Sequence, residues 1–267
     1  MLLLCGQVRE YLYAGCKSPY YTHAILIPFV SACLIFRRRK EIFADAAYAL
    51  APGCATAGLG VFCLVAATAA PEGWGRADVH ALTAPGAVLV TIGAFITVYG
   101  SRAFREARFG LVFLVFMIPL PSAAEHYVLR GLQLGSAEFV GLLFPLTGAP
   151  VLREGVVFQL PGICIEVAPE CSGIRSSLAL VITSALAGHL YLKTAWAKGL
   201  LVLAAFPVTM FKNAIRIVTL SLLGVYVDRG FLDSSLHRDG GIVFFVLALL
   251  IMAPILFLLR RGEGRGK

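Results

Sequence analysis

Charged residues are scarce in this chain. They make up 14% of its 267 residues, whereas 59% are hydrophobic, and the mean hydropathy is +0.84. Soluble domains are roughly 45–50% apolar and about 25% charged. This chain therefore has too few polar side chains to cover its surface in water. Because long apolar runs occur from end to end, we expect one integral membrane domain over residues 1–267.

Metal-binding and redox patterns are also missing from the sequence. The seven cysteines form no CxxC pair and no metal-site spacing, so no metal ion and no cofactor is expected. The net charge of +8 would suit a nucleic-acid partner, but the basic residues gather at the ends of apolar runs. The clusters are Arg37–Lys40, Arg102–Arg108, Lys193–Lys198 and Arg260–Lys267. This distribution follows the positive-inside rule and argues against nucleic acid.

The apolar runs predict an all-α polytopic membrane protein of about seven transmembrane helices. A spanning helix needs about 20 apolar residues, with a range of about 17–25. The expected spans lie near residues 20–36, 45–70, 84–101, 109–121, 172–192, 199–226 and 241–259. This arrangement places every basic cluster on the inner face. The N-terminal segment and the loops 71–83 and 227–240 then lie outside.

The segment 120–170 is the only long stretch between spans, and it is expected on the outer face. Its first part, residues 123–146, mixes Glu125, Arg130 and Gln133 with leucine and valine. This pattern is typical of an amphipathic helix on a membrane surface. Its second part has two β-like runs on either side of Pro161-Gly162, which predicts a small β-hairpin.

Cys171 follows this hairpin, where the fifth span is expected to begin. The positive end of a helix dipole favours the thiolate form of a cysteine, which is the nucleophile. Gly173 allows close approach of a substrate or another backbone, and the free N–H groups of the first turn can hold an oxyanion. An alternative interpretation is a structural cysteine, bonded to Cys164 seven residues earlier.

Arg216 lies within the sixth apolar run, where a charge is costly and indicates a functional site by default. Counting from Gly199, it lies about 25 Å along the helix, near the outer interface. Asn213 precedes it by three residues and shares its helix face. The alternative is an arginine whose side chain extends to the outer lipid phosphates.

His237 lies in the last external loop, where it can act as a base or acid near neutral pH. A solvated loop histidine is the alternative. The topology nevertheless brings Cys171, Arg216 and His237 to one membrane face from three separate segments, as in Cys–His nucleophilic sites. His23, which opens the first span at this face, is placed to line the site.

Several motifs, taken in order, resemble the exosortase/archaeosortase family over most of residues 20–259. They are YTHAILIPFVSACLIFRRR, FMIPLP, GVVFQLPGICIEVAPECSGIRSS, FKNAIRI and LHRDGG, and the stretch ECSGIRSS is the most specific. The Pro169-Glu170 pair is a departure, because more variable small or acidic residues are expected there.

The resemblance implies a membrane-embedded cysteine protease or transpeptidase with a Cys171–Arg216–His237 site. Such enzymes process exported proteins whose C-terminal sorting signal has a Pro-containing motif of the PEP-CTERM type, a transmembrane helix and a basic cluster. An acceptor, such as an exopolysaccharide or a lipid, would receive the cleaved protein. The active site would face the periplasm or cell exterior from the cytoplasmic membrane.

The supporting or substrate-binding residues that we expect are Asn213, Ser172, Gly173, Glu170, Arg175 and His23. Asn213 and Ser172 can supply hydrogen bonds, whereas Glu170 and Arg175 form either a supporting pair or a simple interfacial one. Two other functions stay open on the sequence alone. A polytopic transporter would place its polar residues near mid-membrane, and a non-catalytic assembly factor would use Cys171 structurally.

Overall fold

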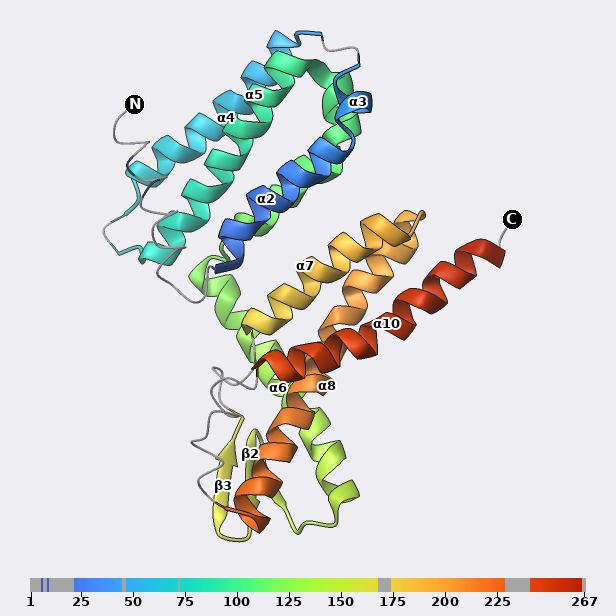
Figure 1. Cartoon of the computed structure of the whole chain (residues 1–267). Helices are drawn as coiled ribbons and strands as arrows, with labels where there is room; N and C mark the ends of the chain where they lie inside the picture. The colour runs from blue at the N-terminus through green and yellow to red at the C-terminus, as the bar shows by residue number, and fades with distance from the viewer. Residues whose placement is uncertain are drawn as a thin grey trace. The chain divides into compact units, whose positions relative to one another are not determined.

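The computed structural model describes residues 6, 9, 22–44, 47–71, 73–167, 174–228 and 241–265. Its contacts divide the chain into two compact units, Met1–Glu125 and His126–Lys267. Helices make up most of both units, and one small sheet belongs to the second (Figure 1). The expected helical membrane protein with a small β-structure is thus confirmed in its main features.

In its described residues, the first unit contains two long helices and three shorter ones. They are α2 (Thr22–Arg37), α3 (Arg39–Ile42), α4 (Leu50–Thr68), α5 (Arg76–Phe113) and the 3-10 helix η1 (Leu114–Met117). Helix α5 runs beside α4, bends, and returns beside α2 (Figure 1). The bend is at Gly100, whose φ of 88° and ψ of 170° interrupt the helix. The expected reversal between the third and fourth spans therefore occurs within one element.

Glycines set how closely α4 and α5 approach. A Cβ on Gly60 would lie 2.6 Å from the backbone nitrogen of Val90, and a Cβ on Gly93 would lie 2.4 Å from that of Ala57. Any side chain at either position would therefore collide with backbone that cannot rotate away. Small residues that let backbones approach are the usual means of helix association in membranes.

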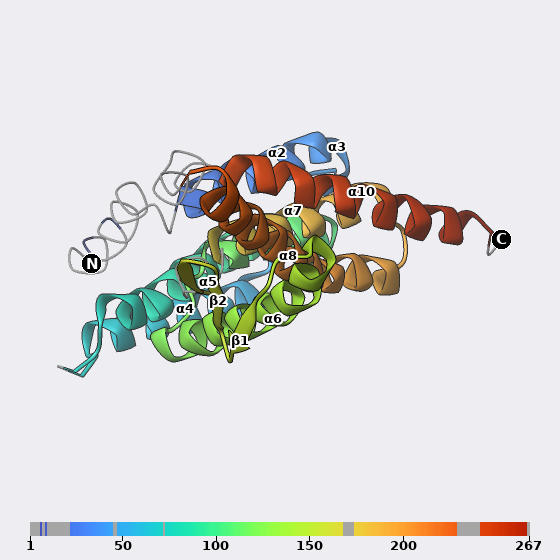
Figure 2. The same cartoon turned by 90° about the horizontal axis from the view of Figure 1, so that it is seen from below.

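The described part of the second unit contains the sheet and four helices. They are α6 (Ser122–Thr147), α7 (Ile174–Tyr191), α8 (Ala195–Tyr226) and α10 (Gly241–Arg265), of which α6 begins four residues before the unit boundary. The strands are β1 (Leu152–Glu154), β2 (Val157–Leu160) and β3 (Ile163–Glu166), all antiparallel in the order β1-β2-β3. The hairpin around Pro161-Gly162 is confirmed, and β1 is an additional strand beside α6 (Figure 2).

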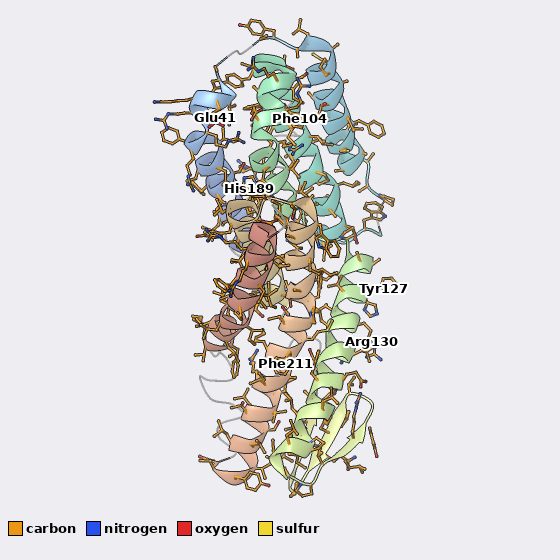
Figure 3. The ribbon with its side chains drawn as sticks, turned by 90° about the vertical axis from the view of Figure 1, so that its right-hand side faces the viewer. Glu41, Phe104, Tyr127, Arg130, His189 and Phe211 are labelled. Carbon is orange, nitrogen blue, oxygen red and sulfur yellow. The ribbon has the colours of Figure 1, made fainter. Side chains whose placement is uncertain are left out.

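Helix α8 organises this unit. Its 32 residues correspond to about 48 Å, more than the hydrocarbon core of about 30 Å. Its C-terminal half packs against α6 and the sheet through a buried cluster that includes Val140, Phe144, Phe158 and Val218. The expected helix over residues 123–146 is present as α6, whereas its place on a membrane surface stays a prediction. Its buried face contacts α8 and the sheet, while Tyr127 and Arg130 project on the side away from α8 (Figure 3).

Four of the described helices are long and apolar enough to cross a membrane. They are Leu50–Thr68, Arg76–Met117, Ala195–Tyr226 and Gly241–Gly264, and the shorter apolar helices Ile25–Arg37 and Ser176–Tyr191 accompany them. This supports a multi-pass membrane protein, whereas the count of seven spans is not confirmed. The expected loop over residues 71–83 is wrong beyond Gly75, because α5 begins at Arg76. The first turn of α5 is therefore polar. Asp78 in this turn accepts hydrogen bonds from the backbone nitrogen and the hydroxyl of Ser122.

An ion pair joins α6 to the sheet and predicts a pH effect. Arg153 of β1 donates hydrogen bonds to the Glu138 carboxylate, at 2.5 Å and 3.1 Å, and so holds the pKa of Glu138 below its usual value of 4.5. A depressed folded-state pKa stabilises the fold above about pH 4.5, and this contribution is lost as the pH falls further. We expect Glu138→Gln to lower the thermal unfolding temperature slightly at pH 7.

The difference between the two proteins should shrink at an acidic pH well below 4.5, because protonation of Glu138 then leaves a neutral side chain at this position in both proteins. Thermal unfolding of the purified chains in detergent at both pH values measures it. The effect is small since both partners are solvent-accessible. A difference that is the same at both pH values would contradict this assignment of the ion pair.

Candidate functional site

The structure describes some of the candidate residues and not others. Arg216 and Asn213 lie on α8. The positions of Glu170, Cys171, Ser172, Gly173 and His237 lie outside the described residues. His23 and Arg175 belong to the described helices α2 and α7, but their side chains are outside the described part. The convergence of Cys171, Arg216 and His237 therefore stays a prediction.

One face of α8 carries the described part of the site. Thr209, Lys212, Asn213 and Arg216 follow the spacing i, i+3, i+4 and i+7, which places them on one side of a helix. The first three are almost completely buried, and Arg216 is half-buried. The sequence interpretation singled out Arg216 and Asn213 and missed Lys212. The available signal was a second basic residue inside the same apolar run.

Asn213 joins this face to α6. Its side chain is fully buried, and its Nδ2 donates a hydrogen bond of 3.2 Å to the Ser136 hydroxyl. Ser136 is also fully buried. Asn213 Oδ1 has no hydrogen-bond partner among the described residues. An amide with one free buried acceptor can receive a further donor, as expected of a group that hydrogen-bonds within a reaction site.

Lys212 joins the same face to α7. Its Nζ donates a hydrogen bond of 2.6 Å to the Ser176 hydroxyl. Helices α7 and α8 run antiparallel, because the loop between them is short and Gly188 lies against Lys198 at their other ends. Arg216, one turn beyond Lys212, therefore lies at the level of the N-terminal end of α7. Ser176 itself lies five residues after Cys171.

The other flank of the Cys171 segment is also held in place. Val167 is fully buried, and its carbonyl accepts a hydrogen bond of 2.7 Å from Gln133 of α6. Its backbone nitrogen donates a hydrogen bond of 3.0 Å to the Val156 carbonyl, in the turn between β1 and β2. Arg130 donates to the Gln133 amide oxygen at 2.8 Å, which orients that side chain. The described residues on both sides of Cys171 are thus bound to the α6–α8 core.

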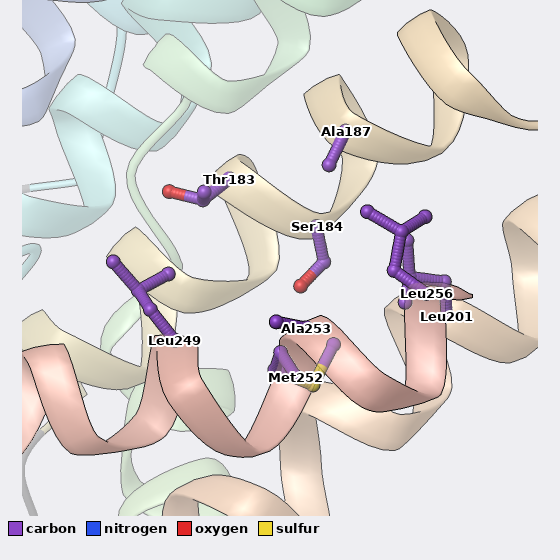
Figure 4. A pocket seen from close by; sticks show the side chains of 8 residues that line it. All are labelled: Thr183, Ser184, Ala187, Leu201, Leu249, Met252, Ala253 and Leu256. Atoms are coloured by element: carbon purple, nitrogen blue, oxygen red, sulfur yellow. The ribbon is translucent and has the colours of Figure 1, made fainter. Parts of the chain in front are cut away.

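A separate apolar cavity of about 150 Å³ lies among α7, α8 and α10 (Figure 4). Thr183, Ser184 and Ala187 line it from α7, about two turns beyond Ser176, and Met252 lines it from α10. Its lining contains no ionisable side chain, and its polar groups are the hydroxyls of Thr183 and Ser184. Within the described ranges no group of three His, Cys, Asp or Glu residues could hold a metal ion.

The structure also bears on the disulfide alternative for Cys171. Cys164 of β3 is exposed and free. The alternative in which Cys171 is bonded to Cys164 therefore has no support. Cys164 is useful as a control, because it is an exposed thiol in the same unit of the protein as Cys171.

Sequence comparison decides the family. The sequence model of transmembrane exosortases matches residues 15–254, which is most of the chain and includes all three candidate catalytic positions. The chain belongs to the transmembrane exosortase family. Exosortases are membrane-embedded sorting enzymes of the cysteine transpeptidase type. Among curated proteins and solved structures, none matches this exosortase.

Proposed function

We propose that this exosortase is a cysteine protease and transpeptidase that cleaves C-terminal sorting signals of exported proteins at the outer membrane face. The observation that carries the proposal is the contact between Lys212 and Ser176. It fixes the register of α7 against α8, and so brings Arg216 to the level of the end of α7 that follows Cys171. A guanidinium beside a nucleophilic thiol is the expected core of such a site.

The position of Arg216 along α8 supports a site at the membrane surface. It lies 21 residues after Ala195, or about 32 Å along the helix axis. The hydrocarbon core is about 30 Å thick. If the basic end of α8 lies at the inner face, Arg216 therefore reaches the outer interface. A soluble acceptor and the polar motif of a substrate can both enter there, in contrast to the mid-membrane site of a transporter.

The mechanism that we propose begins with attack of the Cys171 thiolate on the scissile carbonyl. Arg216 stabilises the oxyanion, and Asn213 and Ser172 add hydrogen bonds. His237 gives its proton to the leaving amine as the C–N bond breaks, which leaves a thioester on Cys171. An acceptor hydroxyl or amine then attacks the thioester, His237 takes its proton, and the thiolate is released.

The other candidate residues support these steps. Gly173 gives the substrate backbone room beside the thiol, and the pair Glu170 and Arg175 positions the motif around it. His23 lines the substrate path. The partners are exported proteins with a C-terminal sorting signal and transmembrane helix, together with a lipid or exopolysaccharide acceptor in or near the cytoplasmic membrane.

Trapping the thioester tests this function. A tagged protein with a C-terminal sorting signal is co-expressed with the exosortase, and the enzyme is purified and digested for mass spectrometry. We expect an adduct on the Cys171 peptide that hydroxylamine removes, and a shorter tagged product on a gel. The Cys164 peptide from the same sample should be unmodified. Absence of the shorter product, or an adduct at another residue, would contradict the proposal.

A further inference from the structure

Lys212 is an unusual residue for the place that it occupies. Its side chain is 2% exposed, so its amine does not extend to lipid headgroups or bulk water. A cation buried in a helix that crosses a membrane costs several kcal/mol unless it is paired. A methionine or leucine of similar volume would fill the same space without this cost. The charge therefore calls for a functional explanation.

The surroundings of Lys212 do little to offset this cost. Its described partner, the Ser176 hydroxyl, is neutral. Arg216 lies one turn further on the same helix face, and like charges at this spacing destabilise a helix. The neighbouring polar groups Thr209 and Asn213 are neutral as well, and each keeps a buried oxygen without a partner in the described residues. The α8 face is thus arranged to hold positive charge beside the first turns of α7.

No carboxylate neutralises Lys212 within the part of the chain that the structure describes. Charged and titratable groups occur on each described element around α8. They are Glu125, His126, Arg130 and Glu138 on α6, Arg153, Glu154 and Glu166 in the sheet, Arg175 and His189 on α7, and those beyond residue 259 on α10. Glu138 is bound to Arg153, and Glu166 is exposed. The anion that this positive charge favours is therefore expected at the N-terminal end of α7.

We propose that Lys212 is a positioning residue for Cys171: its bond to Ser176 fixes the first turns of α7, and its buried charge favours the thiolate. This inference rests on the proposed function, because that function makes Cys171 the nucleophile. Lys212 touches neither substrate nor acceptor. It acts through α7 and through its field, which the low dielectric of the core screens weakly.

Thiol alkylation without any substrate tests this role. The purified exosortase is treated with iodoacetamide at pH 7, and the modification rates of Cys171 and Cys164 are read from their peptides. Lys212→Gln keeps a hydrogen-bond donor for Ser176 but removes the charge, and Lys212→Met removes both. We expect each to lower the Cys171-to-Cys164 rate ratio about tenfold, as for a thiol whose pKa rises by about one unit. Lys198→Gln, which removes a charge from the same helix, should leave the ratio unchanged.

Thermal unfolding separates this role from a purely structural one. Because removal of a buried charge often costs no stability, we expect Lys212→Met to unfold at the wild-type temperature or above it. An unchanged rate ratio in both variants would overturn the proposal. A ratio that is kept by Lys212→Gln and lost by Lys212→Met would overturn the role of the charge. The proposed function fails separately, if no thioester forms on Cys171 of the wild-type enzyme.

Discussion

Replacing Cys171 by alanine is expected to abolish processing of a co-expressed substrate, with no detectable shorter product. The reason is chemical, since the proposed acyl-enzyme route needs the Cys171 thiolate as its nucleophile. The loss of rate should exceed about 10³-fold, as for removal of a catalytic nucleophile in other acyl-transfer enzymes. The amount of folded enzyme should not change, because the substitution removes only the sulfur atom of one side chain.

Cys164→Ala is the matched control for this prediction. Cys164 is an exposed free thiol of the second unit, on a strand whose register with β2 is fixed by backbone hydrogen bonds. Its substitution should leave processing at the wild-type level. The measurement is the ratio of shortened to full-length tagged substrate on a gel, at equal enzyme levels. Processing that survives Cys171→Ala would remove the nucleophile assignment and leave the non-catalytic role of the chain.

The sequence alone predicts those site residues whose chemistry is unusual for their local surroundings. Arg216 is conspicuous because a membrane excludes charge, and Asn213 follows from helix spacing. Lys212 carried the same signal, but its meaning depends on burial and on its contact with Ser176. That contact joins residues 36 positions apart, and no local pattern encodes the register between two apolar helices. The order of the helices can therefore be predicted, whereas their polar contacts cannot.

The fold was predictable where apolar runs end at basic clusters. Helices α2, α7 and α10 begin and end within a few residues of the expected spans, apart from the basic tail of α10. The prediction was wrong for the start of α5, which begins before its apolar part. Asp78 lies in this polar first turn and accepts a hydrogen bond from the Ser122 hydroxyl. Strand β1 was missed because the three residues Leu152–Glu154 are exposed and show no alternation. Strand β1 forms through its antiparallel pairing with β2, which no local sequence pattern indicates.

The bend of α5 is the most specific feature of the first unit, and it leads to a prediction with a large effect. Gly100 combines a φ of 88° with a ψ of 170°, a region that essentially only glycine occupies. A Cβ there would lie 2.1 Å from the carbonyl oxygen of Ala47 and 3.2 Å from its carbon. We expect Gly100→Ala to destabilise the protein by about 3 kcal/mol or more, since strain of about 1–3 kcal/mol adds to a backbone collision.

Relief of this collision would require the chain before α4 to move. Ala49 donates a backbone hydrogen bond to Thr97, and Gly53 packs directly against Thr97, so Ala47 cannot retreat without loosening the α4–α5 contact. The yield of monodisperse protein in detergent and its thermal unfolding temperature should therefore both fall sharply. Gly58→Ala is the control, because Gly58 is an exposed glycine in α4 with nothing within 4 Å of its Cβ position. The Gly58→Ala substitution should be neutral or stabilising by up to about 1 kcal/mol. If both variants have the same stability, the bend of α5 does not require the positive φ of Gly100.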